Sequence, residues 1–110
     1  MGQFIKGDVV VIPFPFSNFS SSKRRPALVI AQTSDNELIL AQITSRSFQD
    51  KYALELSHDD FAVGKLHVLS YIRTNKLFTV EDSLILYKAG HLEQKKVSEV
   101  VDSVVVIIKS

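Results

Sequence analysis

Short runs of β-branched and aromatic residues, each closed by turn or loop residues, make up most of this chain, and such runs are typical of β-strands. No helical pattern separates one run from the next, which excludes the βαβ alternation of a parallel sheet. Pro13 and Pro15 cannot donate to a ladder, so the first strand lies at a sheet edge or ends there. A short helical turn is expected at residues 59–61, and Gly90 predicts a bulge or bend. The predicted strands span residues 9–14, 26–31, 38–43, 53–56, a part of 67–77, and 84–92.

The pattern changes from Glu93 onward, where apolar residues recur at helical spacing and charged residues fall mostly between them. Those apolar positions are Val97, Val100, Val101, Val104, Val105 and Ile108. We predict a C-terminal helix; because valine is a poor helix former, a strand over residues 104–108 is the alternative. The whole pattern predicts a mainly β (α+β) fold, a small and largely antiparallel β-barrel capped by a C-terminal helix.

Length and composition predict one soluble globular domain over residues 1–110, with 45% hydrophobic and 23% charged residues. The formal net charge is only +1, so any binding of nucleic acid has to come from local placement of charge. The absence of cysteine excludes disulfides, thiolate metal sites and a cysteine nucleophile. The chain starts without the apolar core of a signal peptide and has no apolar run of ~18 residues, so we expect a cytoplasmic protein.

A cluster of three cations, residues 23–25, stands directly before an apolar strand. A loop that meets a sheet at this point places the cations on a rigid platform, and the planar guanidinium of arginine matches phosphate oxygens two at a time. The alternative is a solvated charge run. In the neighbouring serine-rich loop, Phe16 and Phe19 suit stacking on the bases of single-stranded RNA or packing on the core, whereas Phe14 is expected in the core.

The three histidines, His58, His67 and His91, are scattered along the chain and lack the spacing of a metal site or of a histidine acid–base pair. We therefore expect each of them to be structural or solvated. The chain also lacks a P-loop and a dinucleotide fingerprint, and we expect no cofactor and no metal.

Four segments together carry a resemblance to a known family. They are Lys-Gly-Asp-Val-Val at residues 6–10, Arg-Pro-Ala-Leu-Val-Ile at 25–30, Gln-Ile-Thr-Ser at 42–45 and Ser-Tyr-Ile-Arg-Thr-Asn-Lys-Leu at 70–77. In order and spacing, over almost the whole chain, they resemble the MazF/PemK family of ribonuclease toxins from type II toxin–antitoxin modules. The resemblance implies an SH3-like barrel, a homodimer, metal-independent cleavage of single-stranded RNA at short sequences, and an antitoxin that occupies the RNA groove.

The resemblance also implies where the chemistry lies. In the family, the Arg of the Arg-Pro segment and the Thr of the Ile-Thr segment sit in the active site, and these positions are Arg25 and Thr44. RNA carries its own nucleophile, the 2′-OH, and its cleavage needs a base, an acid and positive charge on the transition state. An Arg side chain is a poor general acid, since its ordinary pKa lies far above neutral pH. We expect Arg25 to stabilise the scissile phosphate, Thr44 to donate a hydrogen bond and Arg73 to supply a second cation.

Further substrate contacts are expected around these residues. Lys23, Arg24 and Arg46 are assigned to the RNA backbone, and Phe16, Ser45 and Asn75 to substrate binding as well. One branch of the family holds an Arg-x-Asp acid–base pair where this chain has Arg73 and Asn75. An amide cannot accept a proton at neutral pH, so that base role does not carry over to Asn75. The loop also lacks the Gly and Glu that some members carry before the Arg-Pro segment.

Each of these assignments has a plainer alternative: Arg73 as an ordinary surface charge, Thr44 as a β-former, and the other cations as solubilising charges. The leading hypothesis is an endoribonuclease of the toxin type. The second, favoured by Asn75, is a catalytically weak or inactive barrel that binds RNA or a partner peptide, and the third is a structural SH3-like interaction module. A homodimer is also expected because the valine-rich C-terminal segment offers more apolar surface than one small barrel covers.

Overall fold

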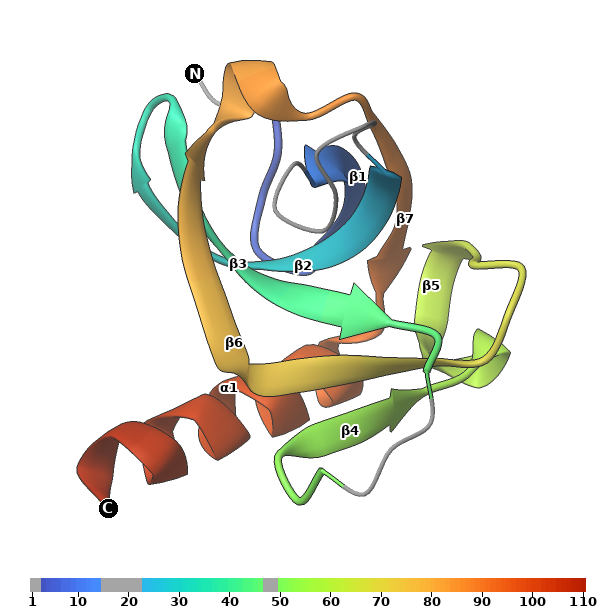
Figure 1. Ribbon diagram of the computed structural model, residues 1–110, viewed down its shortest axis with the longest axis vertical. Coiled ribbons are helices and arrows are strands. Elements are labelled where there is room, and N and C mark those ends of the chain that lie inside the picture. Colours follow the sequence, from blue (N-terminus) through green and yellow to red (C-terminus); the bar gives the residue numbers. More distant parts are fainter. Residues whose placement is uncertain (1–2, 15–22, 47–49) are drawn as a thin grey trace.

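The computed structural model describes residues 3–14, 23–46 and 50–110, and in these parts the chain forms a curled antiparallel sheet with one long helix, α1 (Gln94–Lys109), beside it (Figure 1). The strands are β1 (Asp8–Phe14), β2 (Lys23–Ser34), β3 (Glu37–Thr44), β4 (Ala53–Leu56), β5 (Phe61–Gly64), β6 (Ser70–Glu81) and β7 (Tyr87–Leu92). The predicted antiparallel barrel with a C-terminal helix is confirmed as a half-barrel. The expectations for Phe16 and Phe19 lie outside the described residues, as does the side chain of Phe14.

The described strands form one seven-stranded sheet in the order β4-β6-β3-β2-β1-β7-β5, and each neighbouring pair is antiparallel. β2 lies in the middle of this order. Its residue Leu28 faces Val9 of β1 on one side and Ala41 of β3 on the other. Because both neighbours are paired in a defined register, the positively charged start of β2 is held at a fixed place on the sheet.

The pairing of β3 with β6 contains a large irregularity. Ala41 faces Leu77, yet the next residue, Gln42, faces Arg73, so residues 74–76 bulge out of the ladder. A bulge of this kind bends the strand and re-aims its side chains. It divides β6 into a first half that also pairs with β4 and a second half that pairs with β3 alone among the described strands.

The apolar core has two parts because the central strands are buried on both faces. One part includes two buried valines of α1 and consists of Val9, Leu28, Ala41, Ile43, Leu56, Ile72, Leu92, Val97 and Val100. The other lies on the opposite face and consists of Val10, Ile12, Ala27, Val29, Leu38 and Leu40. Since successive residues of a strand point to opposite faces, the central strands read as continuous apolar runs rather than as an alternating pattern.

Helix α1 packs on the sheet through three buried valines, Val97, Val100 and Val104. The predicted helix is confirmed, and the alternative strand over residues 104–108 is wrong, because burial of this stripe outweighs the low helix propensity of valine. Near its C-terminal end the helix leaves Val105, Val106 and Ile108 exposed. No helix in the described parts of the chain combines the length and apolar character needed to cross a bilayer.

Several strand boundaries differ from the sequence prediction. β2, β3 and β6 extend beyond the predicted runs, because their ladders continue into polar residues that carry no apolar signal. β5 was not predicted, since most of its four residues are exposed. Residues 84–86 precede β7 rather than belong to it, while the helical turn expected at 59–61 is present as a 3₁₀ turn at His58–Asp60.

Two expectations concerned β1 and β7. β1 lies between β2 and β7 and is therefore not an edge strand, but it ends at Phe14, between the two prolines, which is the other outcome expected. Its pairing with β7 stops at Val11, so among the described residues Pro13 is paired with Arg24 of β2 alone, which explains how a proline fits in an inner strand. The bulge or bend predicted at Gly90 is confirmed, because the β1–β7 register shifts directly beside it.

Gly64, the last residue of β5, has a backbone conformation that other residues rarely adopt. Its φ is 76°, and a Cβ atom at this position would meet the backbone carbonyl oxygen of Ala89. We predict that Gly64→Ala lowers the free energy of unfolding by about 1–3 kcal/mol, as strain of this kind does. Val63→Ala, on the same strand at a 66% exposed position, should change it by less than about 0.5 kcal/mol. Urea unfolding measures both, and equal stability of the two variants would contradict the assignment of strain to Gly64.

Candidate functional site

A cavity of about 280 Å3 opens where the beginning of β2 meets the end of β3. The polar side chains of its described wall are Arg24, Arg25, Thr44, Ser45, His67, Ser70 and Tyr87. This wall holds two guanidinium groups and no carboxylate, so among the described residues it is cationic. Guanidinium groups and hydroxyls are the donors that a phosphate group accepts from most readily.

The register of β2 against β3 brings Arg25 and Thr44 together. Ala27 faces Gln42, and the same antiparallel register, continued toward the ends of the strands, sets Arg25 level with Thr44. Both residues then contribute to the wall of one cavity. The structure therefore unites the two residues that were assigned to the chemistry, although each comes from a different segment of the sequence.

Thr44 is placed to act as a hydrogen-bond donor. Its side chain is buried, with 6% of the residue exposed, and its Oγ1 accepts a hydrogen bond from the backbone N–H of Arg46 at 3.2 Å. A hydroxyl that accepts one bond still has its own proton to donate. The hydroxyl of Ser70, by contrast, donates to the carbonyl oxygen of Val68 at 3.0 Å.

Of the other predicted cations, Arg24 belongs to the described wall, and Lys23 and Arg46 are close in sequence to residues of the wall. Lys23 is the first residue of β2 and is exposed, like Arg24 beside it, whereas Arg25 is partly buried. Arg46 is exposed and follows Thr44 closely in the chain. Lys23 and Arg46 are thus adjacent in sequence to residues of the cavity wall, but they are not part of the described wall themselves. Such a position suits contacts to neighbouring phosphates.

Arg73 and Asn75 are not part of the described wall of this cavity. The Nε of Arg73 is 3.5 Å from a carboxylate oxygen of Asp50, and the side chains of this ion pair are 22% and 14% exposed. Asn75 belongs to the bulge at residues 74–76 and is exposed. The structure does not bring either residue into the described wall around Arg25 and Thr44, so the roles assigned to them stay predictions.

Three polar residues of the wall were missed in the sequence: His67, Ser70 and Tyr87. Ser70 had a signal, because it begins the segment at residues 70–77 that carries the family resemblance. His67 and Tyr87 had none, since their positions depend on pairing between distant strands. His91, expected to be structural or solvated, is bonded through Nδ1 to the buried carboxylate of Asp8 at 2.7 Å.

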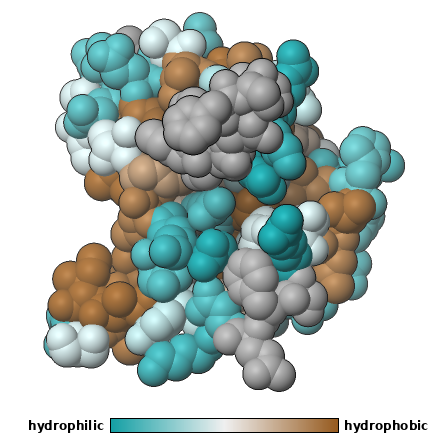
Figure 2. Space-filling view, viewed as in Figure 1, coloured by the Kyte–Doolittle hydropathy of each residue, from teal (hydrophilic) through white to brown (hydrophobic). Residues whose placement is uncertain are grey.

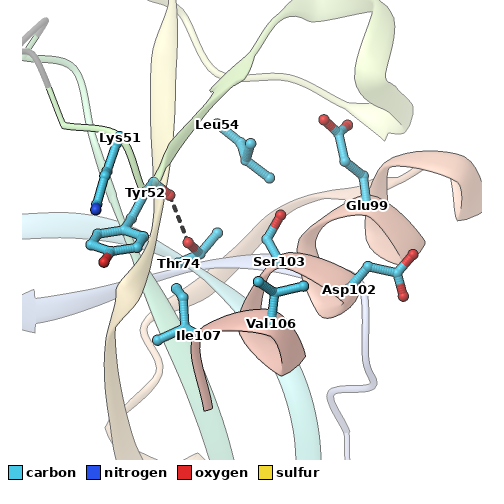
Figure 3. A pocket seen from close by; sticks show the side chains of 9 residues that line it. All are labelled: Lys51, Tyr52, Leu54, Thr74, Glu99, Asp102, Ser103, Val106 and Ile107. Atoms are coloured by element: carbon cyan, nitrogen blue, oxygen red, sulfur yellow. Dashed lines mark hydrogen bonds between the residues drawn. The ribbon is translucent and has the colours of Figure 1, made fainter. Parts of the chain in front are cut away.

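A second cavity, of about 500 Å3, lies between α1 and the β4–β6 side of the sheet (Figure 3). Its lining combines apolar side chains such as Leu54 and Val106 with the carboxylates of Glu99 and Asp102. The hydroxyl of Thr74 in its wall donates to the carbonyl oxygen of Tyr52 at 2.6 Å. Figure 2 shows an apolar patch over the C-terminal part of α1, close to this cavity. Such a surface suits a protein side chain better than a phosphate.

Comparisons of structure find several proteins with the same fold. A mycobacterial endoribonuclease in complex with its cognate antitoxin matches with a TM-score of 0.73 and 8% identity, over 96% of this chain and 95% of that chain. MazF in the MazE–MazF structure from Deinococcus radiodurans matches with a TM-score of 0.72 and 15% identity, over 96% and 94%. The Mycobacterium tuberculosis toxin MazF-mt6 gives 0.71 and 14%, over 93% and 96%. At these identities the likeness establishes a shared fold.

Comparisons of sequence give the family. No curated protein matches the chain by sequence. The model of the PemK-like, MazF-like toxin of type II toxin–antitoxin systems matches residues 5–108, which includes all seven described strands and nearly all of α1. The chain therefore belongs to the PemK-like, MazF-like toxins of type II toxin–antitoxin systems.

Proposed function

We propose that this toxin is a metal-independent endoribonuclease that cuts single-stranded RNA at short, specific sequences in the cytoplasm. The observation that carries the proposal is the meeting of Arg25 and Thr44, from two adjacent strands, in one cavity whose described wall has two arginines and no carboxylate. Family membership and the shared fold support the same reaction class, since the structural neighbours include endoribonucleases. The mRNA of the cell is the substrate that this reaction would destroy.

The reaction follows from how these two side chains would hold a phosphodiester. Arg25 presents its guanidinium to the phosphate oxygens, and Thr44 donates its hydroxyl proton to the same group. Both interactions strengthen as negative charge builds up on phosphorus-bound oxygen in the transition state, which is the condition for acceleration. RNA supplies the attacking 2′-OH, and the charge stabilisation comes from side chains, so no metal ion is required.

Residues around the cavity would hold the rest of the RNA. Lys23, Arg24 and Arg46 form an exposed cationic rim that contacts phosphates on either side of the cleaved bond. Ser45, in the wall beside Thr44, adds a hydroxyl for the sugar or the base. With a net charge of +1 for the whole chain, this rim is what directs RNA to the cavity.

The proposal includes two protein partners, a second copy of this chain and a cognate antitoxin. Structural neighbours were solved with antitoxins, one described as a cognate antitoxin and another as MazE. In this chain, Val105, Val106 and Ile108 are 41%, 67% and 71% exposed on one end of α1. An apolar surface of this kind is costly in water and favours burial in an interface.

A second candidate, binding of RNA without efficient cleavage, is favoured by one observation. Arg73 is held by Asp50, and Asn75 stands where one branch of the family has a carboxylate. Residues 73 and 75 of this chain therefore lack the acid–base pair that this branch of the family has. The two candidates differ in whether the Arg25–Thr44 cavity suffices for chemistry.

We predict that Arg25→Ala lowers the rate of RNA cleavage about 10²–10³-fold, the loss typical of a preorganised group that stabilises transition-state charge. Arg25→Lys should also be slow, because a point charge cannot make the bidentate contact. Gel assays of an unstructured RNA in EDTA measure the rates, and thermal melting checks the fold. Lys95→Ala, which removes an exposed cation from α1, is the matched control and should cleave normally. A wild-type rate in Arg25→Ala would remove this residue from the mechanism.

We predict that Asn75→Asp brings no gain in cleavage rate and a weaker affinity for RNA. The new carboxylate would lie outside the Arg25–Thr44 cavity, so it cannot serve as its base, and its negative charge repels the RNA backbone. Single-turnover rates and RNA binding separate the two effects. A clear rise in rate would instead show that the acid–base pair of the other branch can be rebuilt here and that the natural chain is attenuated.

We predict that the wild-type chain is a dimer in solution and that Val106→Asp weakens the dimer, because the substitution places a charge in the apolar patch on α1. Ser98→Asp adds the same charge to the same helix at an exposed position outside the patch and should leave the dimer intact. Light scattering gives the mass of each. A wild-type mass of 12.3 kDa at micromolar concentration would refute the dimer.

A further inference from the structure

The segment between β5 and β6, residues 65–69, separates two neighbouring cavities. The Arg25–Thr44 cavity lies on one side of it, and a cavity of about 350 Å3, which includes His58 and Phe61 in its wall, lies on the other. Leu66, His67 and Val68 belong to the walls of both. His67 is exposed, so its imidazole can meet a ligand in the cavity that holds Arg25.

The proposed reaction needs a base that the Arg25–Thr44 cavity otherwise lacks. Its described wall contains no carboxylate, and arginines and hydroxyls are poor bases near neutral pH. Residues 1–2, 15–22 and 47–49, which lie outside the described parts, have no acidic, basic, histidine or tyrosine side chain in their sequence, so they cannot supply one. His67 is thus the single imidazole in this wall.

The two other histidines of the chain are engaged or placed elsewhere. The Nδ1 of His91 is hydrogen-bonded to the buried carboxylate of Asp8, at a distance of 2.7 Å. His58 belongs to the wall of the second cavity only. Imidazole is the side chain whose charge ordinarily changes between about pH 5 and 8, which makes it the usual group for taking a proton at neutral pH.

On the basis of the proposed function, we infer that His67 is the general base of the cleavage reaction. Its neutral imidazole takes the proton of the 2′-OH, and the resulting oxygen attacks phosphorus while Arg25 and Thr44 hold the phosphate. The O2′–P bond forms and the P–O5′ bond breaks. The leaving O5′ takes a proton from water, and the hydroxide left behind takes the proton from the imidazolium. The products are a 2′,3′-cyclic phosphate and a 5′-hydroxyl, with no net change in protons.

Other charged or titratable groups share these cavities with His67. They are Arg24 and Arg25 on β2 and Tyr87 on β7 in one, and Lys65 and His58 in the other. Of these, only His58 carries an imidazole, as His67 does. His58→Gln is therefore the matched control for His67→Gln, since each replaces one imidazole by an amide in the same region.

The test measures single-turnover cleavage of an unstructured RNA in EDTA from about pH 5 to 8. We expect the wild-type rate to fall toward acid pH, because protonation removes the active base. His67→Gln should lose about 10²-fold or more of the rate near pH 8 and lose this acid-side fall. Added imidazole should restore part of the rate to His67→Ala. His58→Gln should keep the wild-type rate and profile, and both glutamine variants should bind a 2′-O-methylated RNA as the wild type does.

The outcomes separate this inference from the proposed function. If wild type cleaves, Arg25→Ala does not, and His67→Gln keeps the wild-type rate and pH profile, the base role of His67 is overturned while the function stands. The role is also overturned if His67→Gln changes only the RNA sequence that is cut, since His67 would then contact a base. If wild-type protein leaves RNA intact in every condition, the function and the inference fall together.

Discussion

The middle strand, β2, is buried on both faces, and this burial fixes the position of everything attached to it. Ala27, Leu28 and Val29 lie in the core, and most of their neighbours in β1 and β3 are buried as well, namely Val9, Val10, Leu40 and Ala41. A slip of one residue would exchange the two buried faces and change which apolar side chains pack together, which makes the register costly to change. That same register sets Arg25 level with Thr44. The geometry of the cationic cavity is thus a consequence of packing in the core rather than of interactions within the cavity.

The division of the sequence into strands was largely predictable, and the reason lies in how the core is built. Runs such as residues 26–31 are apolar because both faces of the strand are covered, and α1 carries its valines at helical spacing because only one stripe of the helix is covered. β5 was not predictable, since its residues are mostly exposed and it is held by a ladder to β7. A strand that is held mainly by backbone hydrogen bonds to a distant strand does not need a pattern of apolar side chains, so the sequence does not reveal it.

The candidate site was predictable in part for the same reason. Arg25 and Thr44 stand at the ends of strongly patterned strands, and their segments also carry the family resemblance. The placement of Arg73 and Asn75 was not predictable, because it depends on the bulge at residues 74–76 and on the ion pair with Asp50. His67 lies in a segment without regular structure, whose position is set by the strands on either side of it.

The pairing of β1 with β7 also determines when the cavity can form during synthesis of the chain. Asp8 faces His91 in this ladder, so the first strand needs a neighbour that is made 83 residues later. Tyr87, in the same late strand, completes the wall around Arg25. The sheet therefore closes only after β7 has been synthesised, and closing contacts so distant in sequence is slow. A nascent chain that does not yet include Tyr87 lacks part of the described wall around Arg25.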